Sequence, residues 1–252
     1  MILCYIINLD RSPERWQRIT QSAGINGLNI VRVPAIDGRL LEPPYPHFSD
    51  WGYFLCHGRK INPNQVACYC SHLKALQTFL DSGETHGVIC EDDVHGTTEL
   101  PAVLDEVLRY SDVWDLVRLN GFRRKFHCPV AKLTGGYRLV SDVRSGSGAG
   151  CYLVNRYAAE RILTRLGVMR QEYDVALYYG FPIGIREMTV TPFPVLLDST
   201  SSHSQIGYSD NRYPIWSPYR FNILTALPYR FLTRNCRLLS RLYFALRNYR
   251  VS

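Results

Sequence analysis

The sequence contains no apolar run that approaches the ~20 residues a membrane-spanning helix needs. Its first ten residues are apolar but lack a basic lead and a small-residue cleavage site, so they favour an opening strand over a secretory signal. The Gly-dense residues 145–150 match neither a P-loop nor a dinucleotide-binding fingerprint. They therefore support no prediction of a phosphate site.

The eight cysteines lack the spacing of a disulfide framework or a metal-binding set, since Cys68 and Cys70 are separated by one residue and the others are scattered. Most have apolar neighbours, which favours small buried side chains in a reducing compartment. Together with the missing export signal, this predicts a cytoplasmic protein. The 252 residues suffice for one large domain, or for one domain with an appendage.

Acidic residues are absent after Asp210, whereas eight arginines follow it. These eight exceed the net charge of +7, so residues 1–210 carry a net charge of −1. The positive charge therefore belongs to one local element and not to a broad surface. This argues against a nucleic-acid-binding protein.

The basic residues at the end of the chain fall in a predicted amphipathic helix over residues 228–250. Arg230, Arg234, Arg237 and Arg241 are spaced four, three and four residues apart and form a narrow stripe, while apolar residues lie on another face. A basic stripe beside an apolar, aromatic face fits a helix that lies on an anionic membrane surface. The alternative is a helix packed on the domain or on a second copy of the chain.

Three adjacent carboxylates follow a short apolar run that begins at Gly87 and is typical of a buried strand. On a strand, Glu91 and Asp93 would share one side and Asp92 would take the other. Adjacent acids repel one another, and Mg²⁺ and Mn²⁺ prefer carboxylate oxygens and often bridge to substrate phosphates. The triplet indicates either a divalent-metal site or a solvated acidic turn.

A strand, helix, strand pattern opens the chain. Residues 2–9 and 28–33 are the predicted strands, and the helix between them runs to about residue 23. Asp10 and Asp37 follow the two strands. In an open α/β sheet ligands gather at this edge, although Asp also favours turns for local reasons.

Residues 40–60 are rich in Pro, Gly and aromatics and are predicted to be a long loop. A helix follows, because Asn62 is a good N-cap and Gln65 completes a capping box. Three polar residues lie in the middle of this helix: Ser71, His72 and Lys74.

The chain up to residue 197 alternates predicted helices and strands. Helices are expected at residues 98–110, 155–167 and 173–177, and strands at residues 114–120, 151–154, 183–186 and 189–197. Asp174 begins the third helix, where the helix dipole alone also favours a carboxylate. His203 lies in a polar loop and has no apolar reason to be there.

The order and spacing of four blocks resemble glycosyltransferase family 25, the enzymes of lipo-oligosaccharide biosynthesis and their procollagen galactosyltransferase relatives. The blocks are residues 5–15, residues 32–38, residues 65–76 with 91–94, and residues 148–155 with Asp174. Gln65 stands where the family usually has Glu, and the tail beyond residue 210 lies outside the shared blocks.

The resemblance implies an α/β fold of the GT-A-like type, with a central mixed sheet flanked by helices. Residues 1–210 would form a single nucleotide-binding domain, and residues 211–252 a basic helical tail. The family's chemistry is inverting transfer from a UDP-sugar, commonly UDP-galactose or UDP-glucose, with Mn²⁺ or Mg²⁺ held against the diphosphate. The acceptor would be a saccharide on a glycolipid of lipopolysaccharide biosynthesis, at the inner face of the cytoplasmic membrane.

The resemblance also suggests residue roles. Asp93 would be the main metal ligand, supported by Glu91 or Asp92, with His203 as an additional ligand. Asp174 would be the general base that takes the proton from the acceptor hydroxyl. The donor-binding residues would be Asn8, Asp10, Arg11, Asp37, Ser71, His72, Lys74 and Asp92. The main alternative is a catalytically silent GT-A-like domain that binds carbohydrate or a partner, which the intact acidic triplet and Asp174 disfavour.

Overall fold

The computed structural model describes residues 2–57, 61–121, 126–144, 148–178, 183–197 and 226–248. Its strands are β1 (Leu3–Asn8), β2 (Asn29–Pro34), β3 (His86–Glu91), β4 (Val94–Gly96), β5 (Leu116–Arg118), β6 (Phe126–Lys132), β7 (Arg138–Arg144), β8 (Cys151–Asn155), β9 (Glu187–Thr191) and β10 (Val195–Leu197). Its helices are α1 (Pro13–Thr20), α2 (Ala23–Asn26), α3 (Asp50–His57), α4 (Pro63–Asp81), α5 (Leu100–Leu108), α6 (Arg156–Arg165), α7 (Tyr173–Tyr178) and α9 (Ala226–Asn248), with short 3₁₀ turns η1 (Gly38–Leu40) and η2 (Thr134–Gly136).

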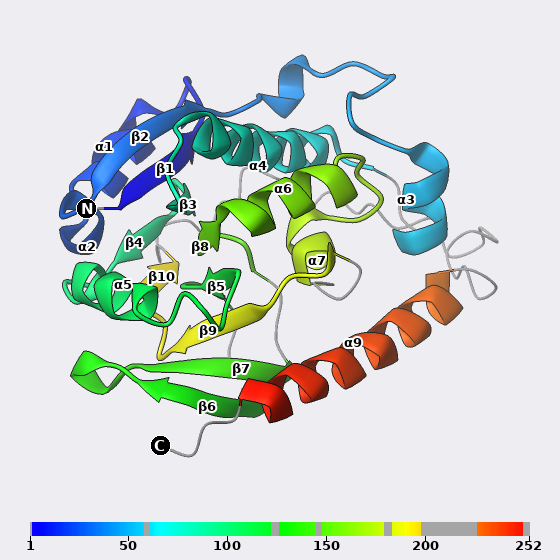
Figure 1. Ribbon diagram of the computed structural model, residues 1–252. Helices are drawn as coiled ribbons and strands as arrows, with labels where there is room; N and C mark the ends of the chain where they lie inside the picture. The colour runs from blue at the N-terminus through cyan, green and yellow to red at the C-terminus, as the bar shows by residue number, and fades with distance from the viewer. Residues whose placement is uncertain are drawn as a thin grey trace.

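A central eight-stranded sheet has the order β2-β1-β3-β8-β5-β9-β7-β6 (Figure 1). The first three strands are parallel, β8 runs antiparallel to β3 and β5, and β9 runs parallel to β5. The last two strands, β7 and β6, form an antiparallel hairpin at the edge of the sheet. This confirms the predicted α/β class with a central mixed sheet flanked by helices.

Two apolar clusters cover the two faces of the sheet, and the alternation of side chains along β1 supplies both. Cys4 and Ile6 belong to the cluster beneath α1, α2 and α5, whereas Tyr5 and Ile7 belong to the cluster beneath α4, α6 and α7. A strand buried on both faces is a nearly continuous apolar run, which is why residues 2–7 are so apolar.

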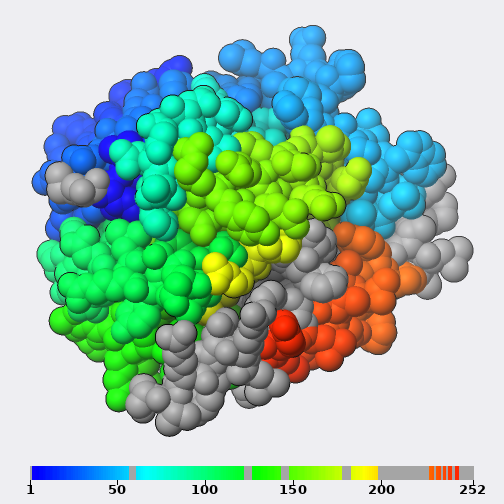
Figure 2. Space-filling model, viewed as in Figure 1, coloured from blue at the N-terminus to red at the C-terminus, as the bar shows by residue number. Residues whose placement is uncertain are grey.

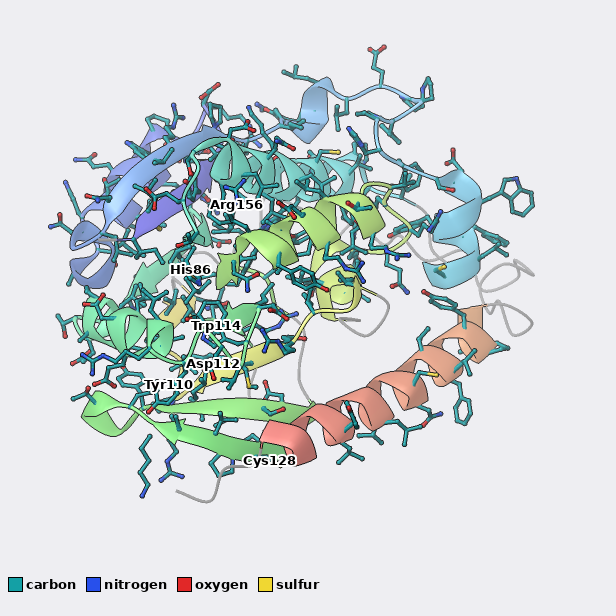
Figure 3. All side chains as sticks on the ribbon, in the orientation of Figure 1. His86, Tyr110, Asp112, Trp114, Cys128 and Arg156 are labelled. Carbon is teal, nitrogen blue, oxygen red and sulfur yellow. The ribbon has the colours of Figure 1, made fainter. Side chains whose placement is uncertain are left out.

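The ends of several elements are tied together by side chains on the helical layers (Figure 3). Arg156, at the start of α6, donates from Nη1 to the carbonyl of Leu80 at 2.9 Å, close to the end of α4. Trp114 is buried, donates from Nε1 to the carbonyl of Val107 at 3.0 Å, and lies 5.4 Å from the His86 ring. Arg156 thus joins α6 to α4, and Trp114 joins α5 to β3.

The predicted capping box of α4 is confirmed. The Asn62 side chain accepts a hydrogen bond from the backbone N–H of Asn64 at 2.9 Å, and the Gln65 side chain accepts one from the Asn62 backbone at 3.3 Å. Val66, Leu73 and Leu76 of the expected apolar stripe are buried. The start of α4 is therefore fixed by local polar contacts and its packing by its apolar face.

Two predictions for the first half were wrong in detail. The first helix ends at Thr20 rather than near residue 23, because the hydroxyl of Ser22 accepts a hydrogen bond from the backbone N–H of Gly96 at 2.9 Å and draws the chain out of the helix. Residues 40–60, expected to be a loop, contain α3, in which Tyr53 is buried and packs on Phe48 with ring centroids 5.5 Å apart.

In the second half, the β6–β7 hairpin was not predicted, and residues 183–186 are not a strand in the described chain. The expected strand at residues 189–197 is split into β9 and β10. Pro192 lies at the break and has no N–H to give to a sheet. After it the chain leaves the large sheet, and β10 pairs with β4.

The predicted C-terminal helix is present as α9, which packs against β7 and α3. Several of its apolar side chains are exposed, among them Phe231, Leu232, Leu239 and Tyr243. Among the described residues, no helix combines the length and apolar character required to cross a membrane. The eight cysteines are free thiols.

Candidate active site

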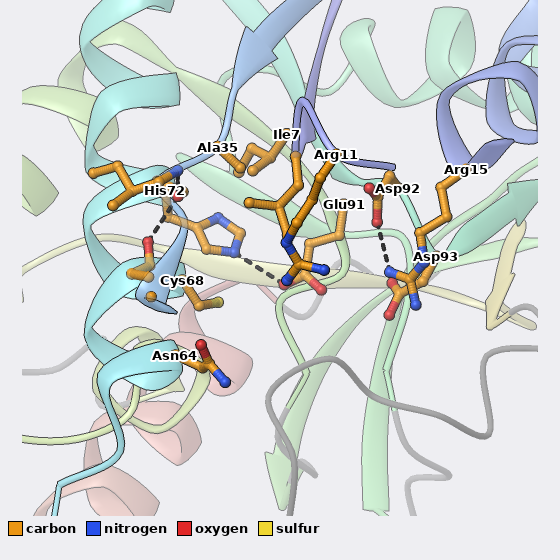
Figure 4. Close-up of a pocket in the computed structure, with 15 residues that line it drawn as sticks. Ile7, Arg11, Arg15, Ala35, Asn64, Cys68, His72, Glu91, Asp92 and Asp93 are labelled. Carbon is orange, nitrogen blue, oxygen red and sulfur yellow. Dashed lines mark hydrogen bonds and ion pairs between the residues drawn. The ribbon is translucent and has the colours of Figure 1, made fainter. Parts of the chain in front are cut away.

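A pocket opens at the carboxyl ends of β1 and β3, beside the N-terminal half of α4 (Figure 4). Its charged and titratable lining residues are Arg11, Arg15, Cys68, His72, Glu91, Asp92 and Asp93. Strand β3 ends at Glu91, and the chain turns there, so all three acidic residues reach the pocket. The alternation expected for a continuing strand thus stops at Glu91.

Asp93 carries the least compensated charge of the triplet. Its Oδ1 is buried and has no hydrogen-bond partner in the described part of the chain. Burial, followed by repulsion from Glu91 and Asp92, raises the pKa of Asp93 to about 7. A divalent cation beside this carboxylate would give the oxygen its missing partner and favour the ionised form. The donor set therefore fits a cation such as Mn²⁺ or Mg²⁺.

Asp92 is held by two donors from the first strand and helix. The Asn8 side chain donates to Asp92 Oδ2 at 2.7 Å, and Arg15 Nη1 donates to Asp92 Oδ1 at 2.9 Å. Burial raises the pKa of Asp92, and the contacts from Asn8 and Arg15 oppose that rise. Asn8 is itself buried and accepts hydrogen bonds from Arg32, so it positions Asp92 from behind and does not line the pocket.

Glu91 faces His72, which is almost completely buried at 1% exposure. The distance from His72 Nε2 to Glu91 Oε1 is 3.0 Å. One face of the His72 imidazole stacks on the Tyr173 ring, with the ring centroids 4.1 Å apart and the ring planes 6° apart. The contacts with Glu91 and Tyr173 therefore fix the His72 side chain in the wall of the pocket.

Arg11 is positioned at the pocket by an ion pair with Asp37, in which Arg11 Nε lies 2.8 Å from Asp37 Oδ2. Asp37 also accepts hydrogen bonds from Arg39, and these, more than the contact with Arg11, lower the pKa of the Asp37 carboxyl. Asp37 itself does not line the pocket. The ion pair with Asp37 keeps the Arg11 guanidinium close to the acidic triplet.

The remaining predicted residues divide between pocket and surface. Ser71 lines the pocket, and its hydroxyl accepts from the backbone N–H of Ile36 at 2.9 Å. Lys74 points away and donates to the carbonyl of Pro34 at 2.8 Å, while Asp10 is exposed and pairs with Arg32 at 2.9 Å. His203 lies outside the described residues.

Asp174 is the second residue of α7, which packs against α4. Burial first, and then the charges of Glu91, Asp174 and Asp93, raise the pKa of the Cys68 thiol. The Asp174 carboxylate therefore lies within electrostatic reach of Cys68, which lines the pocket, but Asp174 is not itself among the lining residues.

Sequence reasoning gave no role to three residues that shape the site. Arg15 holds Asp92, and its position in the first turn of the helix that follows the first strand was the available signal. Cys68 lines the pocket one helical turn before His72, which was also readable from spacing. Tyr173 supports His72 by stacking, and nothing in its local sequence indicates that contact.

Comparison with protein families supports the resemblance. A family model described as "Glycosyltransferase family 25 (LPS biosynthesis protein)" matches residues 1–177, which is most of the chain. The matched region contains the pocket, the acidic triplet and Asp174.

Three curated proteins are similar to parts of the chain. A "Glycosyltransferase 25 family member" of Aedes aegypti is 26% identical over 45% of this chain and 20% of its own length. "Procollagen galactosyltransferase 1" of Danio rerio is 23% identical over 63% of this chain and 28% of its own length. "Probable inactive glycosyltransferase 25 family member 3" of Rattus norvegicus is 26% identical over 46% of this chain and 22% of its own length. The chain thus spans less than a third of each of these relatives.

Proposed function

Because this chain belongs to glycosyltransferase family 25, we propose that it transfers a hexose from a UDP-sugar to a saccharide acceptor in a reaction that depends on Mn²⁺ or Mg²⁺. The transfer inverts the configuration at the anomeric carbon, and the hexose is galactose or glucose. The acceptor is a glycolipid of lipo-oligosaccharide or lipopolysaccharide biosynthesis.

One observation carries the proposal: a buried Asp93 oxygen, which has no hydrogen-bond partner among the described residues, belongs to a pocket that also contains two guanidinium groups. A UDP-sugar presents a diphosphate with two negative charges, which suits Arg11 and Arg15. A divalent cation held by Asp93 and Glu91 would, when bound, offset the charge on the departing diphosphate. In the pocket, the guanidinium groups that suit the diphosphate of the donor thus lie next to the carboxylates that suit the cation.

The residues of the chain supply positioning and proton transfer. Asn8 and Arg15 hold Asp92, and Asp37 holds Arg11, so the charged groups are oriented before the donor binds. The Asp174 carboxylate accepts the proton of the acceptor hydroxyl. The hydroxyl oxygen forms the new bond to the anomeric carbon, and the bond from that carbon to UDP breaks, so that UDP leaves with the bonding electron pair.

We further propose that α9 attaches the enzyme to the cytoplasmic face of an anionic membrane. Helix α9 lies on the surface beside α3 (Figure 2). Its sequence contains five arginines and no acidic residue, and Phe231, Leu239 and Tyr243 are exposed. Apolar side chains beside positive charge match the interface of an anionic bilayer. A second copy of the chain is the competing partner for this face.

The test is UDP release from a panel of UDP-sugars by the purified chain, with Mn²⁺ and then with chelator, in the presence of candidate glycolipid acceptors. We expect chelator-sensitive turnover of one sugar, and a loss of about 100-fold or more in Asp93→Asn. Asp105→Asn is the matched control, because Asp105 is an exposed carboxylate on α5. Full activity in Asp93→Asn would refute the metal assignment.

A catalytically silent binding domain is the second candidate, because one of the similar proteins is named as probably inactive. It retains metal-dependent UDP binding but releases no UDP with any donor and acceptor. Turnover above the level of the Asp93→Asn variant excludes it.

A further inference from the structure

One wall of the pocket carries three side chains whose chemistry differs from that of the acidic triplet. Cys68, His72 and Glu91 each offer one ligand atom, and the three atoms lie within 4.8 Å of one another. Cys68 and His72 are four residues apart on α4 and therefore lie on the same face, while Glu91 ends β3 opposite them. Figure 4 shows Cys68 and His72 at the left of the pocket, with Glu91 toward the middle and a dashed line between His72 and Glu91.

His72 is oriented as a metal-binding histidine would be. Its Nε2 faces Glu91, and its Nδ1 lies 3.4 Å from the hydroxyl of Tyr152, which in turn lies 2.8 Å from the hydroxyl of Tyr173. The buried ring is also stacked on Tyr173. A ligating imidazole usually directs its second nitrogen to a polar partner that fixes the ring and the tautomer. Tyr152, itself held by Tyr173, is that partner for Nδ1, which leaves Nε2 facing Glu91 and the proposed cation.

The same orientation argues against a nucleophilic cysteine. In a Cys–His–acid constellation, the acid and the nucleophile contact opposite nitrogens of the imidazole. Here the acid contacts Nε2, and Nδ1 is directed to Tyr152. Cys68 and Glu91 lie on the pocket side of the ring, and both line the pocket. The geometry suits a shared cation better than a proton relay.

The types of ligand select the cation. Thiolate and imidazole favour zinc-class metals, whereas Mn²⁺ and Mg²⁺ favour carboxylate and water oxygens. Three protein ligands leave a fourth position free in a tetrahedral site. Among the described residues, no Arg or Lys forms an ion pair with Glu91, so its negative charge is available to a cation.

We propose that Cys68, His72 and Glu91 form a binding site for a thiolate-preferring divalent cation of the zinc class, next to the carboxylate site at Asp93. Because the two sites share Glu91 and the same pocket, zinc occupancy excludes the productive arrangement of Mn²⁺ and nucleotide. The site thus makes the pocket sensitive to inhibition by zinc. Metal binding at this wall does not depend on glycosyl transfer, whereas the inhibition by zinc rests on the proposed function.

The test is a titration of the untagged, full-length chain with Co²⁺, a spectroscopic substitute for zinc. The wild type should develop a near-ultraviolet thiolate-to-cobalt charge-transfer band that saturates at one equivalent and disappears when Zn²⁺ is added. Cys68→Ser should lose the band. Cys128→Ser is the matched control, since it removes another partly buried free thiol on β6, and it should keep the band.

Two outcomes would overturn the proposal: no thiolate band in the wild type at saturating Co²⁺, or the same band in Cys68→Ser. Circular dichroism melting of each variant separates a lost ligand from a lost fold. If Cys68→Ser does not fold, Glu91→Gln provides the second variant and should weaken Co²⁺ binding by at least about tenfold. If Glu91→Gln binds Co²⁺ with the wild-type affinity, as measured by the thiolate band, the proposed ligand set would also be overturned.

The inhibitory consequence is measured by the binding of UDP in Mn²⁺. Stoichiometric Zn²⁺ should abolish that binding in the wild type and in Cys128→Ser, and should leave most of it in Cys68→Ser. Equal inhibition of all three proteins would show that zinc acts elsewhere. A thiolate band in a chain that transfers no sugar would support the zinc site and count against the transferase, and turnover without any band would do the reverse.

Discussion

Asp115, just before β5, accepts hydrogen bonds from Asn155 at the end of β8 and from Arg186 just before β9, the two strands on either side of β5. Its Oδ2 receives the backbone N–H of Arg186 at 2.7 Å, and its Oδ1 receives Arg186 Nη2 at 2.8 Å and the Asn155 side chain at 3.2 Å. Burial would raise the pKa of Asp115, but the hydrogen bonds and charge of Arg186 outweigh it and lower the pKa. The ionised form of Asp115 therefore stabilises the fold.

Asp115→Asn should lower the free energy of unfolding at pH 7 by roughly 1–2 kcal/mol, since Arg186 is partly exposed and its hydrogen bonds are screened. Because the folded-state pKa is below the unfolded value of about 3.9, the difference from wild type should stay constant from pH 7 to pH 5. It should shrink as the pH falls below 4.

Urea unfolding of both proteins across this pH range measures the difference. Asp105→Asn, which removes an exposed carboxylate, should stay within about 0.5 kcal/mol of wild type. Equal unfolding midpoints for Asp115→Asn and wild type at pH 7 would show that the ion pair contributes nothing.

At the scale of elements, the turn η1 is pressed against the start of α4. A Cβ added at Gly38 would lie 2.4 Å from Asn64 Oδ1 and 2.6 Å from Asn64 Cα. Asn64 cannot retreat easily, because its backbone N–H is held by the Asn62 cap. Gly38 also lines the pocket. Close packing of two elements and the shape of the site therefore depend on the same residue.

Gly38→Ala should destabilise the fold by about 1–3 kcal/mol through overpacking and should weaken UDP binding as the pocket wall shifts. Thermal unfolding and calorimetric titration with UDP measure the two effects. Gly27→Ala is the control, since its Cβ would meet the Pro101 side chain at 3.1 Å and the Gly24 carbonyl oxygen at 3.9 Å, both longer than the contacts at Gly38. A Gly38→Ala protein as stable as Gly27→Ala would contradict the close contact.

Elements with strong local signals were predictable, and those fixed by distant contacts were not. The Asn62 cap and the apolar stripe of Val66, Leu73 and Leu76 are local, so α4 could be placed from sequence. Helix α3 depends on packing of Tyr53 against Phe48, and its aromatic sequence has no helical apolar period. The β6–β7 hairpin was missed, because its outer strand contains Pro129, a residue that argues against a strand.

The residues of the candidate site also divide into those that a local sequence pattern indicates and those that depend on distant contacts. The acidic triplet and His72 were predicted because strand ends and helix centres place polar residues in recognisable contexts. The pairing of Asn8 with Asp92 joins residues 84 positions apart, and no local pattern encodes that distance. Sequence thus indicated most of the charged groups that line the pocket, and only the fold indicates which of them compensate one another.

For the whole molecule, the proposed attachment of α9 to an anionic membrane has the largest consequence. Phe231 is 73% exposed, Leu239 is 68% exposed and Tyr243 is 59% exposed. Replacing all three by Ser should weaken binding to vesicles that contain anionic lipid on the order of 100-fold, at about 1 kcal/mol for each side chain. Vesicle co-sedimentation measures this change.

Leu40→Ser is the control for that variant, since Leu40 is 81% exposed and lies on η1 rather than α9. It should bind vesicles like wild type. If the triple variant binds vesicles normally and instead converts a dimer to a monomer in light scattering, the exposed face of α9 serves a second copy of the chain.

The central claim is that Asp93 links a divalent cation to nucleotide binding in the pocket at the ends of β1 and β3. Isothermal titration of UDP into wild type, Asp93→Asn and Asp174→Asn, each with Mn²⁺ and with chelator, tests it most directly. We expect wild type and Asp174→Asn to bind UDP only with Mn²⁺, and Asp93→Asn to bind it in neither condition. UDP binding to Asp93→Asn with the wild-type affinity, or equal binding to wild type in chelator, would contradict the account.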